Sequence, residues 1–104
     1  MENQQLQPQQ NLNKLQMQYA QTECVDEIKK SLVIVMERLN MDFKNIDTTA
    51  LDIFTEFKYM KLPMIIEALR KGSLGAYGST FRLNTQEVCI WIRKYNESKA
   101  SYIL

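Results

Sequence analysis

Apolar residues recur at intervals of three and four along most of this chain, a spacing that places them on one face of an α-helix. The longest such stretch predicts a helix from Thr22 to Leu39, with an apolar face made of Val25, Ile28, Leu32, Val35, Met36 and Leu39. Val33 and Ile34 widen that face, so we expect the helix to pack on more than one side. No segment alternates steadily between apolar and polar residues, which argues against a sheet and leaves open only a two-strand ribbon near residues 77–83.

Two shorter helices are predicted between residues 47 and 71. The first starts at Asp47 or Thr48, because either side chain can accept a hydrogen bond from a free first-turn amide. Its expected core face is Ala50, Leu51, Phe54, Phe57 and Met60, with Ile53 to one side. Pro63 ends or bends this helix and, since proline is tolerated in a first turn, starts a third one that ends at Lys71 with Gly72 as its cap.

The residues from Asn84 to Glu87 predict the start of a last helix. Asn84 can cap it, and Glu87 three residues later can return a hydrogen bond to the cap. The helix should reach about Ser98 and bury Val88, Trp91, Ile92 and Tyr95. The expected fold class is therefore all-α, a small bundle of about four helices with a glycine-rich loop before the last helix.

The first twenty residues differ in composition from the rest of the chain. Residues 1–21 contain eight glutamines and few apolar residues, too few to offset the entropy of ordering. We predict a flexible segment over residues 1–20, disordered to about residue 11, followed by a single helical domain over residues 21–104. The alternative is a segment that folds on a partner through Leu12, Leu15 and Tyr19.

Charge is divided unevenly along the chain. Residues 1–57 hold five Lys or Arg against nine Asp or Glu, a net charge of −4, and residues 58–104 hold eight against three, a net charge of +5. A short chain can acquire such asymmetry by chance, and it also fits a basic surface that meets phosphates or an acidic partner.

The absence of histidine argues against an enzyme, because it removes the commonest general base and the commonest metal ligand together. We therefore expect no catalytic residues, no cofactor and no metal. Cys24 and Cys89 lie among apolar residues and are expected to be buried free thiols. No apolar run has transmembrane length and no signal peptide is evident, so a cytoplasmic protein without a membrane partner is expected.

The glycines all fall in one short window, at positions 72, 75 and 78. A helix cap and a turn explain them without any ligand. The window is also surrounded by cations and aromatic rings, which can hold phosphates and stack on unpaired bases. It is neither a P-loop, since the glycine-lysine-threonine ending is missing, nor a Rossmann fingerprint, since no strand precedes it.

The candidate contact surface combines this window with cations of the last helix. Phe81 and Leu83 are equally explained as core residues, and cations near a helix C-terminus are favoured by the helix dipole alone. Lys99, Lys58 and Lys61 could extend the surface. The residues predicted to contact nucleic acid or a partner are Arg70, Lys71, Gly75, Tyr77, Gly78, Arg82, Arg93 and Lys94.

The stretch from Leu62 to Tyr95 has a characteristic order of residues. A short helix is followed by Lys71-Gly72, Gly75, Tyr77-Gly78, Phe81, Asn84, Gln86, Trp91-Ile92 and Tyr95. This order resembles small accessory proteins of bacterial phages and mobile elements, some of them associated with replication and similar to helicase-loader domains.

The resemblance implies a DNA-replication accessory role without an activity of its own, with DNA or a replication protein as the partner. It places weight on Lys71, Gly72, Tyr77, Gly78, Gln86, Trp91 and Tyr95, of which Trp91 and Tyr95 are expected to be structural. The chain departs from the pattern near Asn84, where an aspartate is expected before the helix. It also lacks ATPase motifs, which excludes a complete ATP-driven loader and leaves an adaptor or DNA-contacting fragment.

The leading hypothesis is a non-catalytic accessory protein that contacts DNA or a replication protein through the basic, glycine-rich loop. One alternative is a protein-interaction module that uses the N-terminal segment or a groove between helices. The other is a small structural homo-oligomer with no nucleic-acid binding.

Overall fold

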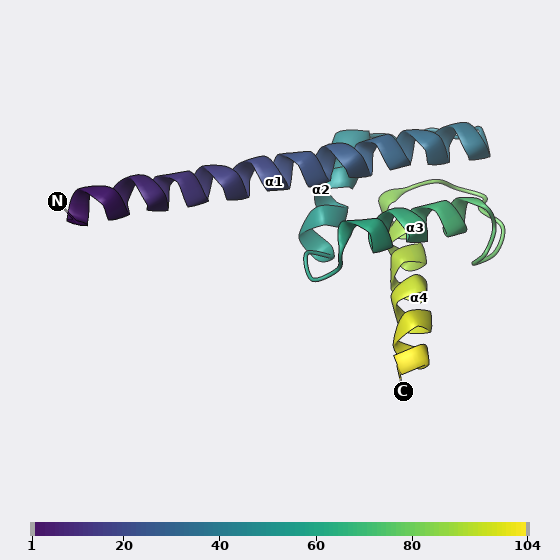
Figure 1. Cartoon of the computed structure of the whole chain (residues 1–104). Helices are drawn as coiled ribbons and strands as arrows, with labels where there is room; N and C mark the ends of the chain where they lie inside the picture. The colour runs from purple at the N-terminus through teal and green to yellow at the C-terminus, as the bar shows by residue number, and fades with distance from the viewer. Residues whose placement is uncertain (1, 104) are drawn as a thin grey trace.

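The computed structural model describes the backbone of residues 2–103 and the side chains of residues 20–99. It contains four helices, α1 (Glu2–Leu39), α2 (Ile46–Glu56), α3 (Leu62–Ser73) and α4 (Thr85–Ile103) (Figure 1). The all-α prediction is confirmed. No residue from 2 to 103 lies in a strand, so the ribbon considered near residues 77–83 is not formed.

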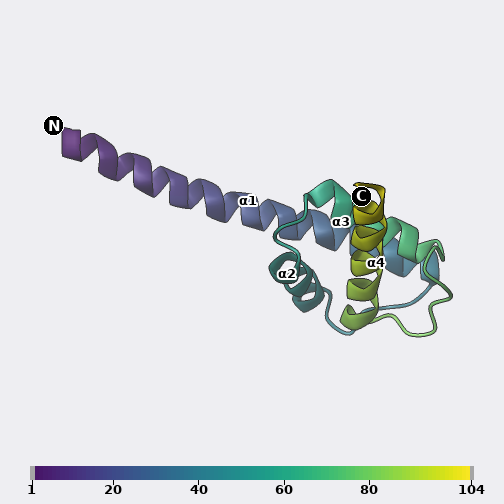
Figure 2. The same cartoon turned by 90° about the horizontal axis from the view of Figure 1, so that it is seen from below.

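The first helix gives the molecule its elongated shape, which measures 62 × 37 × 16 Å. The N-terminal part of α1 extends away from the other three helices, whereas its C-terminal part lies beside α2 and α3 (Figures 1 and 2). The helical backbone begins at Glu2, where the sequence predicts a disordered tail to about residue 11. Whether residues 1–20 are flexible stays a prediction, because the side chains of residues 1–19 lie outside the described ones.

The predicted core face of α1 is confirmed. Ile28, Leu32 and Val35 are buried, and the other predicted positions pack partly against the same core. The helix contacts both α2 and α3, as its wide apolar face predicts. Val33 and Ile34 themselves, however, remain exposed, although Ile34 lines a groove between α1 and α3.

A Schellman motif ends α1. Asn40 has a φ of 52°, in the left-handed region that asparagine tolerates better than most residues. The Met41 amide donates to the Met36 carbonyl over 3.1 Å, and the Asn40 amide donates to the Glu37 carbonyl over 3.4 Å. Phe43, just beyond, is buried.

The cap predicted for α2, Asp47 or Thr48, lies two or three residues too late. Asn45 is its N-cap, and the side-chain oxygen of Asn45 accepts a hydrogen bond from the Thr48 amide over 3.0 Å. Asp47 and Thr48 lie inside the first turn, and Asp47 instead forms an ion pair of 2.7 Å with Lys29. Asparagine caps as well as aspartate does, so local preference alone did not separate the three positions.

The core face predicted for α2 also needs correction. The buried residues are Thr49, Ala50, Ile53, Phe57 and Met60, whereas Leu51 is 47% exposed and Phe54 only partly buried. The predicted core face omits Thr49 because threonine is polar. Its hydroxyl, however, donates to the Asn45 carbonyl over 2.9 Å and lies 2.7 Å from the Thr85 hydroxyl. A satisfied hydroxyl can be buried, and the buried stripe therefore runs through Thr49, Ile53 and Phe57.

The role predicted for Gly72 is wrong. This glycine lies inside α3, which ends at Ser73. The C-cap is Leu74, and Gly75, with a φ of 87°, follows it in the left-handed position of a Schellman motif, in which the Ala76 amide donates to the Lys71 carbonyl over 3.0 Å. Gly72 is needed for another reason, because a Cβ at this position would overlap the indole ring of Trp91. Pro63 lies in the first turn of α3, as predicted.

The predicted start of α4 is confirmed in part. The Asn84 side-chain oxygen accepts a hydrogen bond from the Glu87 amide over 2.8 Å. The predicted return bond is absent, since the Glu87 carboxylate accepts the indole N–H of Trp91 over 3.2 Å instead. The predicted stripe of Val88, Trp91, Ile92 and Tyr95 is buried, and the helix continues past Ser98 to Ile103. It runs crosswise to α3 (Figure 1).

Candidate functional site

The segment between α3 and α4, residues 74–84, forms one loop fixed at its start and end. Gly75 and Gly78 have φ values of 87° and 110°, and the Gly78 amide donates to the Gly75 carbonyl over 3.1 Å. A Cβ at either glycine would meet no atom within 4 Å, so these residues serve backbone conformation and not close approach. Leu83 is buried and anchors the end of the loop in the core, as one of the two interpretations of that residue expected.

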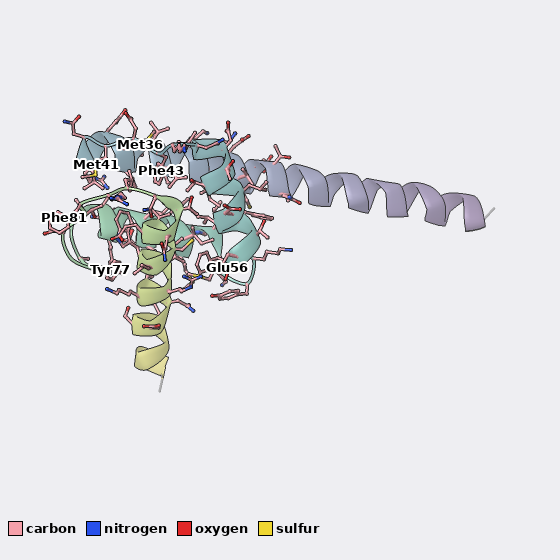
Figure 3. The ribbon with its side chains drawn as sticks, turned by 180° about the vertical axis from the view of Figure 1, so that it is seen from behind. Met36, Met41, Phe43, Glu56, Tyr77 and Phe81 are labelled. Atoms are coloured by element: carbon pink, nitrogen blue, oxygen red, sulfur yellow. The ribbon has the colours of Figure 1, made fainter. Side chains whose placement is uncertain are left out.

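Phe81 lies on the outside of this loop (Figure 3). Its ring is 91% exposed, so the interpretation of Phe81 as a core residue is wrong. The adjacent Arg82 is exposed and forms no ion pair with any side chain of residues 20–99. Such an exposed phenylalanine is unusual here, because every other aromatic residue between positions 20 and 99 except Tyr59 is at least partly buried.

Tyr77 holds the first half of the loop against the body. Its side chain is partly buried and packs on the hydrophobic core. Burial raises the pKa of the Tyr77 phenol, and the neighbouring Tyr95 and Glu67 raise this pKa further. The phenol is therefore uncharged at neutral pH, and it acts as an anchor between α3 and α4 more than as a free stacking surface.

Two lysines converge on the ring of Tyr95. The Lys71 ammonium, from the last turn of α3, lies 5.5 Å from the ring centroid, and the Lys99 ammonium, one turn beyond Tyr95 on α4, lies 5.4 Å from it. Both distances are within the range of a cation–π interaction. This ring therefore joins the end of α3 and the far half of α4 into one basic surface beside the loop.

The remaining predicted cations lie elsewhere. Arg93 faces α2, where it pairs with Glu56 over 3.4 Å and lies 5.6 Å from the centroid of the Phe57 ring. Arg70 pairs with Glu67 over 3.0 Å and lines a groove between α1 and α3. Lys94 is exposed without an ion pair among residues 20–99, but no contact links it to the loop.

The structure therefore groups Gly75, Tyr77, Gly78 and Arg82 on the loop that directly follows the end of α3 and Lys71, and it directs Arg70 and Arg93 to carboxylates of α3 and α2 instead. Tyr95 and Lys99 belong with the first group, although the sequence assigned Tyr95 a structural role and Lys99 only a possible extension. The i, i+4 spacing of Tyr95 and Lys99 on a helix was the feature of the sequence that indicated their contact. We use the name loop surface for the exposed and half-buried side chains of this group together with Phe81. The loop surface consists of Lys71, Tyr77, Phe81, Arg82 and Lys99.

Other sites for chemistry are sparse in the described part of the chain. Cys89 is buried, which raises the pKa of its thiol, while Cys24 is only partly buried, and both are free. Among residues 20–99 no group of three or more Cys, Asp or Glu side chains is placed to hold a metal ion. No helix, over its described residues, combines the length and apolar character needed to span a membrane.

Comparisons with protein-family models, with curated proteins and with solved structures find no match to this chain.

Proposed function

We propose that this chain is a non-catalytic accessory protein that binds nucleic acid through the loop surface. The observation that carries the proposal is Phe81, which is 91% exposed beside Arg82, a cation that forms no ion pair with residues 20–99. An exposed ring can stack on a base of any sequence, and neighbouring cations can hold the phosphates. The resemblance to replication accessory proteins of phages and mobile elements supports DNA as the nucleic acid and replication as the setting.

The anchoring of the loop also supports the proposal. Buried Leu83 fixes one end of the loop, and Gly75 and Tyr77 fix the other, so Phe81 is presented on a short, constrained segment. A group held in its binding conformation before the ligand arrives loses less conformational entropy on binding.

The test is fluorescence anisotropy of the full chain with labelled single-stranded and duplex DNA, from low to physiological salt. We expect the wild type to bind and Phe81→Ala to weaken binding about tenfold or more, since stacking on one aromatic ring contributes about 1–3 kcal/mol. Leu51→Ala is the matched control, because Leu51 is an exposed apolar residue of α2, 47% exposed, outside the loop surface.

Either of two results would contradict the proposal. One is a wild-type protein that does not bind DNA at low salt. The other is Phe81→Ala binding as tightly as Leu51→Ala while circular dichroism shows both variants folded.

A protein-interaction module is the second candidate, and a groove between α1 and α3 favours it. This groove has a volume of about 110 Å³ and is lined by Ser31, Ile34, Val35, Arg38, Ile66 and Arg70. Exposed Ile34 and the two arginines suit a partner that is both apolar and acidic. Absence of DNA binding would make this groove the surface to test, and light scattering at several concentrations would show whether the partner is a second copy.

A further inference from the structure

Lys71, Tyr95 and Lys99 form a cluster in which two positive charges share one aromatic ring. The two ammonium groups come from different helices, yet both lie within 5.5 Å of the same ring centroid. None of the ion pairs formed among residues 20–99 includes either lysine. The cluster is therefore a site of uncompensated positive charge.

The ring explains how two like charges are kept close without a carboxylate. The face of an aromatic ring carries partial negative charge, which attracts each ammonium group. Tyr95 itself is buried to 6% exposure, so the ring is fixed while the lysines reach the surface. Because the ring has no formal charge, the cluster keeps its full attraction for an anion.

The spacing of the cluster fits a phosphate backbone. The two centroid distances put the ammonium groups no more than about 11 Å apart, a span that covers only a few phosphates of one strand, whose charges follow one another at about 3.4 Å of rise. The loop links this cluster to Phe81, since Tyr77 is within electrostatic reach of Tyr95 and Phe81 follows Tyr77 four residues later on the same loop (Figure 3).

We propose that Lys71 and Lys99 bind successive phosphates of a single nucleic-acid strand while Phe81 stacks on one of its unpaired bases. This inference rests on the function proposed above. It names the ligand as single-stranded, because the bases of a duplex are stacked on one another and offer no free face to Phe81. Tyr95 is a positioning residue that acts through the two lysines.

The test is the salt dependence of binding, measured by anisotropy with a labelled oligothymidylate. For a single strand, the plot of log affinity against log salt has a slope near −0.7 for each phosphate neutralised. We expect Lys71→Ala and Lys99→Ala each to make the slope shallower by about 0.7, and the double variant by about twice that. Phe81→Ala should weaken binding at every salt concentration and leave the slope unchanged, because stacking releases no counterion.

Two further variants separate the ring from general stability. Tyr95→Phe keeps the ring face and should keep the wild-type slope, whereas Tyr95→Leu removes the face and should make the slope shallower. Lys30→Ala is the matched lysine control, since Lys30 is an exposed lysine of α1 that pairs only with Glu27. Its slope should equal that of the wild type.

The outcomes distinguish the inference from the function on which it rests. If the lysine variants keep the wild-type slope while Phe81→Ala loses affinity, the lysine site is wrong and the loop still binds nucleic acid. If Lys30→Ala changes the slope as much as Lys71→Ala does, the site is not specific and the inference fails. Duplex DNA binding as tightly as the oligothymidylate would overturn the choice of a single strand, and no binding by the wild type would overturn both proposals.

Discussion

Gly72 and Gly75, three positions apart, are required for unrelated physical reasons. Gly72 lies in the helical interior of α3, where glycine normally weakens a helix, and it is tolerated because Trp91 of α4 occupies the space of its missing side chain. Gly75 has open space around it and is required by its φ of 87°. One glycine permits the contact between two helices, and the other ends a helix.

These roles predict different costs for the same substitution. Gly72→Ala should lower the free energy of unfolding by about 2 kcal/mol or more, because an added methyl group forces the buried indole out of position. Gly75→Ala should cost about 1 kcal/mol, the strain of a left-handed residue that carries a Cβ. Urea denaturation of both variants measures the difference, and a smaller loss for Gly72→Ala than for Gly75→Ala would contradict the close approach of Trp91.

At the scale of helices, the two asparagine caps position the starts of α2 and α4. The side chain of each accepts one amide, from Thr48 and from Glu87 respectively. Just inside the two caps, the Thr49 and Thr85 hydroxyls lie 2.7 Å apart, so the two helix starts are joined to each other. The start of α4 and the end of the loop therefore depend on α2 as well.

Loss of either cap should cost about 1 kcal/mol of unfolding free energy, so we expect similar losses for Asn45→Ala and Asn84→Ala. Asp47→Ala should cost less than about 0.5 kcal/mol, since Asp47 contributes only an exposed ion pair with Lys29. Thermal unfolding followed by circular dichroism compares the three variants. A larger loss of unfolding free energy for Asp47→Ala than for Asn45→Ala would contradict Asn45 as the cap and support Asp47, a position predicted from sequence.

The helices were predictable because each carries a repeating apolar stripe, and the Asn84 cap was predictable because a glutamate follows it at the right distance. The Asn45 cap was not, since three neighbouring residues cap equally well and only the packing of α2 against α1 and α4 selects among them. The exposure of Phe81 and the cluster around Tyr95 were also out of reach, because burial and contacts between helices depend on how the elements pack. Within the candidate site, the loop and its cations could be predicted from the sequence. Which of these cations lie near one another depends on the packing of the helices and could not be predicted.

At the scale of the whole molecule, the body is formed by the second half of α1 together with α2, α3 and α4 (Figures 1 and 2). Among the described side chains of α1, residues 20–39, burial begins at Ile28, with partly buried Cys24 and Val25 preceding it. Helical segments without packing add little stability, because most of the stability of a helix in a protein comes from its buried face.

Deletion of residues 1–19 should therefore leave the unfolding free energy of the remaining chain within about 1 kcal/mol of the full-length value. Urea denaturation of the two proteins provides the measurement, and an unchanged m-value would show that the same surface is exposed on unfolding. A loss of several kcal/mol would show that the first helix is part of the core along its whole length.

The burial of Trp91, the only tryptophan, against Gly72 gives the chain an intrinsic optical probe. Its indole lies at the contact between α3 and α4, with its N–H bonded to Glu87, so its emission reports whether that contact is intact. Separation of the two helices would bring the indole into water and shift the emission to longer wavelengths. A ligand on the loop surface that leaves this contact intact should not shift the emission wavelength, so unfolding can be followed in the presence of the ligand without an attached dye.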